Sequence, residues 1–151
     1  VLETGSLQGR MRVASGTIAA GTGDIDNDDV LMMVQIPSNA KVLSIKLFND
    51  DLDSNGSPSL AANVGLYYVN GTVLDEDCYA TAITTLQAAE TTGAEVAFEA
   101  RNVNAVSNFA WEDGGLSSDP AEPLRIALTM SNAAATAAAG DVTLIVTYVV
   151  D

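Results

Sequence analysis

The sequence consists of short runs of apolar and β-branched residues, each ended by turn-forming residues. Residues 30–36 (VLMMVQI) stop at a proline, and residues 41–49 (KVLSIKLFN) alternate with a period of two. In the second run Leu43, Ile45 and Leu47 share one side of an expected strand, and this side should face the core. Runs of this length, bounded by turn residues, favour strands over helices.

Further β-type runs extend this pattern along the chain. They cover residues 10–18, 63–74, 95–100, 124–130 and 141–150. Asn70 and Gly71 lie inside the second of these runs, and this dipeptide predicts a hairpin with a two-residue type I′ turn. About seven or eight strands result, so the sequence predicts an all-β fold, either an antiparallel β-sandwich or a jelly-roll-like barrel.

Three other segments are expected to lie in loops. Residues 79–90 and 102–111 carry apolar residues near helical spacing. Both segments are short, so we expect one or two turns of helix in loops that cross between strands. The alanine-rich residues 131–140 lack large apolar anchors and lie between two strong strands, which favours a hairpin loop.

The length of 151 residues corresponds to one domain with a single core. We expect residues 13–151 to form this domain. Residues 1–12 are expected to form an N-terminal arm or a lead-in to the first strand. Neither a signal-peptide pattern nor an apolar run near the ~20 residues of a membrane span is visible, so no membrane partner is expected.

The chain is strongly acidic, with 6 basic and 20 acidic residues and a formal net charge of −14. A surface of this sign repels nucleic-acid phosphates and anionic membranes, so neither is an expected partner. It attracts cations and basic protein surfaces instead. The single cysteine, Cys78, permits no intramolecular disulfide. Its neighbours supply no cation, and we expect it to be packed and inert.

The chain contains no histidine, the commonest general base and the commonest transition-metal ligand. Ser-His-Asp and Cys-His catalysis are therefore excluded, and a zinc site is not expected. Most carboxylates fall in polar loops, which lack the burial that a general acid needs. The sequence thus predicts a protein that is not an enzyme and has no catalytic residue.

The stretch DLDSNG, residues 51–56, matches the first half of a calcium-loop pattern. The twelfth position of that pattern is Ala62 instead of Glu, which excludes a complete EF-hand loop. The candidate calcium ligands are oxygen-bearing side chains in two acidic stretches: Asp51, Asp53, Asn55, Asp24 and Asp26. The interpretation that we favour is a tight acidic turn between two core strands, because Asp, Asn, Ser and Gly are typical turn residues.

Residues 29–71 combine several features of one kind of protein. These features are a strand that ends in Ile36 and Pro37, a short turn before Lys41, an acidic DDLDSNGSP segment after the next strand, and a VGLY run that begins at Val64. Together they resemble small virion structural proteins of tailed bacteriophages, including capsid decoration (cement) proteins. The resemblance covers roughly the first half of the chain, and the final expected strand adds weak support.

The resemblance implies a nonenzymatic β-sandwich without a cofactor that assembles on a capsid through protein contacts. The implied partners are the major capsid protein or other virion proteins and further copies of the chain, with a trimer over a local symmetry axis as one arrangement. The acidic surface agrees with the outer capsid surface, because packaged nucleic acid would repel it. Arg10 and Arg12 of the arm would then pair with carboxylates of a neighbour.

The alternative from another functional class is a calcium- or carbohydrate-binding β-sandwich module of a secreted or surface protein. In a calcium module the acidic loops would hold the ion, and added calcium would raise the thermal stability. Aromatic residues make up only 5% of the chain, so a carbohydrate-stacking platform has little support. A hydrolase that uses loop carboxylates is a third alternative.

Overall fold

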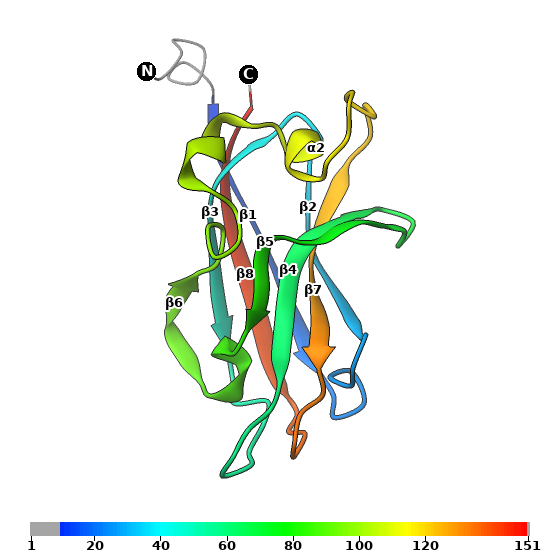
Figure 1. The fold of residues 1–151 in the computed structure, drawn as a ribbon. Coiled ribbons are helices and arrows are strands. Elements are labelled where there is room, and N and C mark those ends of the chain that lie inside the picture. The colour runs from blue at the N-terminus through cyan, green and yellow to red at the C-terminus, as the bar shows by residue number, and fades with distance from the viewer. Residues whose placement is uncertain (1–9, 151) are drawn as a thin grey trace.

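A computed structural model describes residues 10–150 and contains two antiparallel four-stranded sheets packed face to face (Figure 1). The strands are β1 Arg10–Ala20, β2 Val30–Ile36, β3 Lys41–Asn49, β4 Ala61–Tyr68, β5 Val73–Ile83, β6 Glu90–Glu95, β7 Leu124–Asn132 and β8 Gly140–Val150. One sheet has the strand order β1-β8-β3-β6 and the other β2-β7-β4-β5. The predicted all-β class with seven or eight strands is confirmed.

The helical segments are short and lie in loops. They are η1 Thr85–Gln87, η2 Val103–Ser107 and α2 Ala110–Asp113. The prediction of helical turns in residues 102–111 is confirmed. The prediction for residues 79–90 is wrong for its first part, which continues β5, and only the single turn η1 follows. Within residues 10–150 no helix is both long enough and apolar enough to span a membrane.

Most connections cross from one sheet to the other. Only β4 and β5 are neighbours both along the chain and within a sheet. The crossing connections produce the interleaved, jelly-roll-like strand order. The alanine-rich residues 131–140 therefore contain a loop, as predicted, but they do not form a hairpin, because they lead from β7 in one sheet to β8 in the other.

The β4–β5 hairpin forms where the sequence predicts it, but its turn is of another type. The N–H of Tyr68 donates to the carbonyl of Thr72 at 2.9 Å, and the N–H of Gly71 donates to the carbonyl of Tyr68 at 3.0 Å. Only Gly71 in this loop has a positive φ, of +89°. A type I′ turn needs positive φ at two successive residues, so the two-residue type I′ prediction is wrong. The longer loop accommodates Asn70 in an ordinary conformation.

The core fills the space between the sheets, and β3 supplies Val42, Ile45 and Leu47 to it, all 0% exposed. The sequence predicts Leu43 in place of Val42. A register shift in the pairing of β3 with β8 between Val42 and Ser44 reverses the alternation there, so Leu43 is only half-buried.

Strand β6 overlaps the predicted run of residues 95–100 only at Glu95. Val96 and Ala97 of that run are buried, but they follow the strand. The carboxylate of Glu95 explains this early end, because its Oε1 accepts from the N–H of Ile45 at 2.9 Å and from that of Ala97 at 3.0 Å. The N–H of Val96 still donates to the carbonyl of Ile45 at 2.9 Å, so the Glu95 side chain replaces the backbone acceptor only for the N–H of Ile45.

Candidate functional site

The DLDSNG stretch lies in the β3–β4 loop, and its central residue Asp53 is 1% exposed. The Asp53 carboxylate accepts from backbone N–H groups of Ser59 at 2.7 Å, Leu60 at 3.0 Å, Ala135 at 2.9 Å and Thr136 at 2.9 Å. Burial raises the pKa of Asp53, but these donors outweigh burial and hold the pKa well below its usual range. The carboxylate therefore joins the β3–β4 loop to the β7–β8 loop.

The other candidate ligands in this stretch make bonds that are typical of turns. Asp51 Oδ1 accepts from the N–H of Asp53 at 3.1 Å, and Asn55 Oδ1 accepts from the N–H of Ser57 at 2.9 Å. The Asn55 amide also donates to Thr136 Oγ1 at 2.8 Å. These contacts agree with the favoured interpretation of the stretch as an acidic turn.

Asp24 and Asp26 lie in the β1–β2 loop, and both bond within that loop. Asp24 Oδ2 accepts from the N–H of Gly21 at 2.8 Å, and the N–H of Asp26 donates to Asp29 Oδ2 at 2.8 Å. In the part of the chain that the structure describes, no three His, Cys, Asp or Glu side chains are grouped to hold a metal ion. Calcium binding by the five candidate residues remains a prediction.

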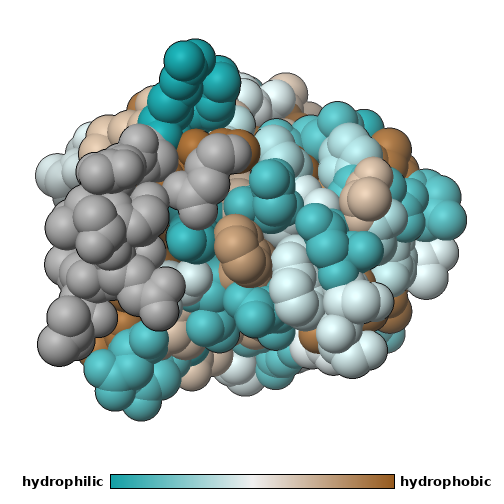
Figure 2. Space-filling view, turned by 90° about the horizontal axis from the view of Figure 1, so that it is seen from above, coloured by the Kyte–Doolittle hydropathy of each residue, from teal (hydrophilic) through white to brown (hydrophobic). Residues whose placement is uncertain are grey.

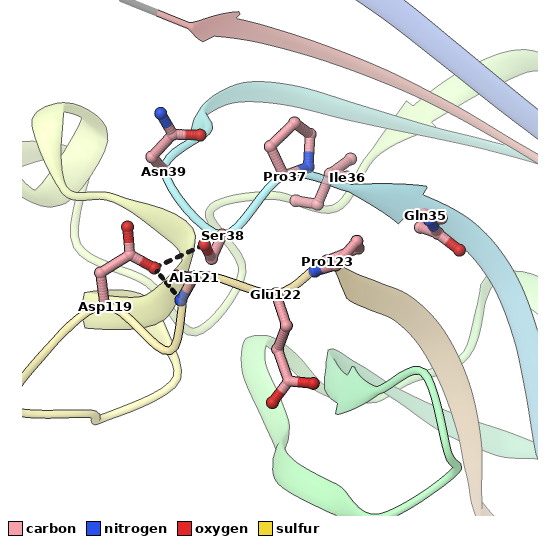
Figure 3. A pocket seen from close by; sticks show the side chains of 9 residues that line it. All are labelled: Gln35, Ile36, Pro37, Ser38, Asn39, Asp119, Ala121, Glu122 and Pro123. Carbon is pink, nitrogen blue, oxygen red and sulfur yellow. Dashed lines mark hydrogen bonds between the residues drawn. The ribbon is translucent and has the colours of Figure 1, made fainter.

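A surface hollow of about 410 Å³ lies between the β2–β3 turn and the segment before β7 (Figure 3). It is lined by Gln35, Ile36, Pro37, Ser38, Asn39, Asp119, Ala121, Glu122 and Pro123. Ser38 Oγ donates to Asp119 Oδ1 at 2.6 Å, and the N–H of Ala121 donates to the same oxygen at 2.8 Å. These two bonds hold the pKa of Asp119 below its usual value. The polar groups of the hollow thus hold the β2–β3 turn and the segment before β7 together.

Arg101 and Asp113 form a buried ion pair that the sequence does not reveal. Nη1 of Arg101 lies 2.5 Å from Asp113 Oδ2, and Nη2 donates to the carbonyl of Val42 at 2.7 Å. The guanidinium lies over the rings of Tyr79, at 5.1 Å, and Phe98, at 4.5 Å. The pair anchors the connection after β6 to β3 and β5. No sequence pattern marks it, because both partners lie in irregular or short elements.

Cys78 lies in β5 and packs against the core. Burial raises the pKa of its thiol well above the usual value, and the nearby Asp75 carboxylate raises it further. A thiol held in the protonated form is a poor nucleophile. This environment agrees with the predicted packed, inert cysteine.

Arg10 and Arg12 lie in β1, the outermost strand of its sheet, which pairs with β8. β1 begins at Arg10 and so includes the end of the predicted arm, whereas residues 1–9 lie outside the described part. Met11 and Val13 are 69% and 64% exposed. Figure 2 shows this end of the molecule from above, with hydrophilic and hydrophobic residues interspersed.

No protein-family model and no curated protein sequence matches the chain. Two solved structures do match. A chain of the cyanophage Pam1 capsid asymmetric unit has a TM-score of 0.68 and 26% sequence identity, and the match covers 95% of this chain and 86% of that one. This chain has the fold of a phage capsid component. A chain from the capsid of Ralstonia phage GP4 has a TM-score of 0.71 and 20% identity, with the same two coverages.

The match to the two phage chains extends over both sheets, because it covers 95% of this chain in each case. The similarity to the GP4 chain, at 20% identity, is a similarity of fold. The similarity to the Pam1 chain adds a modest sequence relationship, at 26% identity. Both agree with the resemblance to phage virion proteins that residues 29–71 carry, and they support a structural role in a virion.

Proposed function

We propose that this protein is a nonenzymatic structural component of a phage virion, of the decoration (cement) type, which binds the outer surface of the capsid through protein contacts. The observation that carries this proposal is the similarity of nearly the whole chain to chains of two phage capsids. Its partners would be the major capsid protein or other virion proteins, together with further copies of the chain.

The charge of the protein supports an outer position. A net charge of −14 would repel packaged nucleic acid at the inner surface of a shell, whereas it favours solubility on the outside. An acidic surface also attracts basic surfaces of other virion proteins, which would guide the protein to its site.

The packing of the loops supports a role in holding a shell together. Asp53 bonds the β3–β4 loop to the β7–β8 loop, and Arg101 bonds the connection after β6 to β3. Loops that are fixed in this way present a preformed surface, which reduces the entropy lost on binding. To stabilise a shell, a protein needs only a preformed surface that is complementary to the shell.

The proposal is tested with capsids assembled without this protein. We expect the purified protein to co-sediment with these shells in a saturable manner and to raise the temperature at which they break open, because binding to the intact shell stabilises it by mass action. Shells of an unrelated phage serve as the control. Absence of saturable binding, or binding without any change in shell stability, would contradict the decoration role.

A further inference from the structure

The exposed cations of this acidic protein are gathered at one place. All six basic residues lie in the described part of the chain, and only Arg10 and Arg12 are exposed. The other basic residues are half-buried or buried: Lys41, Lys46, Arg101 and Arg125. Among residues 10–150 the ion pairs are Lys46–Glu95 and Arg101–Asp113, so neither exposed arginine is paired there.

The two arginines alternate with two exposed apolar residues at the start of β1. Met11 is 69% exposed and Val13 is 64% exposed. We call residues 10–13 the basic tip. β1 is the outermost strand of its sheet, so its free edge can accept a partner. Exposed apolar side chains flanked by cations are typical of a contact surface with an apolar centre and a charged rim.

A surface of opposite charge lies on β5, an edge strand of the other sheet. Val73 is 51% exposed, and Asp75, Glu76 and Asp77 follow it in the strand. We call residues 73–77 the acidic edge. Burial raises the pKa of Asp75, and the neighbouring Asp77 carboxylate adds to this by repulsion. A cation placed beside these carboxylates would relieve that repulsion.

The basic tip and the acidic edge lie on edge strands of different sheets. In Figure 1, β1 begins at the top near the C-terminus, whereas β5 begins at the β4–β5 loop that projects to the right. β1 packs beside β2, and β5 lies near β6 at its later residues, Thr81 to Ile83, and not at the acidic edge. β1 and β5 pair with different strands, so the two surfaces are separate regions of one chain. A two-fold contact that joins each surface to its own copy would place arginines against arginines or carboxylates against carboxylates. A head-to-tail contact places opposite charges together, and such contacts close into a ring when the rotation between copies permits.

We propose that copies of this chain associate head to tail, with the basic tip of one copy on the acidic edge of the next. The occupant of the tip is thus a second copy of the chain. This contact deepens the proposed function by naming the surfaces through which the copies associate, but it does not depend on the binding of a shell.

The experiment measures the mass of the full chain by light scattering at low and high salt. The tip variant is Arg10→Glu with Arg12→Glu, and the edge variant is Glu76→Arg with Asp77→Arg. We expect the wild type to have a multiple of the 15.6 kDa chain mass at low salt. In each variant the dissociation constant of the contact between copies should rise at least about tenfold, because like charges then face each other. A chain that carries all four reversals should regain the wild-type mass.

The matched control is Asp26→Arg with Glu122→Arg, which changes the net charge as the edge variant does but lies in loops outside β5. It should keep the wild-type mass. A monomeric wild type, an unchanged mass in the tip variant, or no recovery in the fully reversed chain would each overturn the proposal. Circular dichroism shows whether the edge variant folds. If it does not fold, the tip variant and the salt dependence of the wild-type mass decide whether the proposed contact between copies exists.

Shell binding is measured on the same variants. A tip variant that dissociates but still binds shells as a monomer supports the contact between copies. A tip variant that keeps its mass but loses shell binding assigns the basic tip to the shell and overturns the proposed contact. Failure of all variants and the wild type to bind shells contradicts the decoration role and leaves the mass measurements to decide the self-contact.

Discussion

At the scale of single residues, Asp53 shows how one carboxylate can organise a loop. Its two oxygens receive backbone N–H groups from its own loop and from the β7–β8 loop. Replacement by Asn removes the charge and directs an amide group at those donors. We expect Asp53→Asn to lower the free energy of unfolding by on the order of 3 kcal/mol, measured by denaturant titration. Asp51→Asn, at an exposed position, is the control and should change it by less than about 0.5 kcal/mol.

The pH dependence separates the charge of Asp53 from its packing. Because the pKa of Asp53 is lower in the folded state than in the unfolded state, its contribution to stability is complete above the unfolded pKa of about 3.9. It is lost as the pH falls from there through the folded pKa. The difference in stability between wild type and Asp53→Asn should therefore narrow in acid. A difference that stays constant down to pH ~2 would show that the charge has no part in it.

At the scale of elements, the β4–β5 hairpin depends on a glycine in β4. A Cβ on Gly65 would lie 2.2 Å from the backbone carbonyl oxygen of Asp75, so β5 would have to move. We expect Gly65→Ala to lower the free energy of unfolding by about 1–3 kcal/mol, measured by chemical denaturation. Gly56→Ala is the control, because a Cβ there meets no atom within 4 Å. Equal effects of the two substitutions would contradict the close packing of β5 on β4.

At the scale of the whole molecule, the acidic loops bear on the calcium alternative. The carboxylate of Asp53 is already bonded to backbone donors, and Asp51 and Asp24 each accept from a backbone N–H as well. We therefore expect the melting temperature to be the same in calcium and in chelator. Calcium at a concentration 100 times its dissociation constant would add about 2.7 kcal/mol to the free energy of unfolding. A rise of several degrees in calcium would thus contradict this expectation and favour a calcium module.

The sequence by itself determined the fold class and most of the strands, because the period-two alternation and the turn residues are local properties of the chain. The bounds of β2 and β3 agree with the predicted runs, and the region of η2 and α2 was indicated by its spacing. The acidic turn and the resemblance to phage virion proteins were also visible in short local patterns.

The tertiary structure decided the features that depend on contacts distant in sequence. The register shift beside Leu43 arises from pairing with β8, and β6 ends early because Glu95 bonds to Ile45 of β3. The β7–β8 loop crosses from one sheet to the other because β7 and β8 belong to different sheets. The hydrogen bond from Ala135 in this loop to Asp53 joins residues that are far apart in the chain. Local preference determines which residues form strands, but only packing determines which strands become neighbours and which side chains replace the backbone between them.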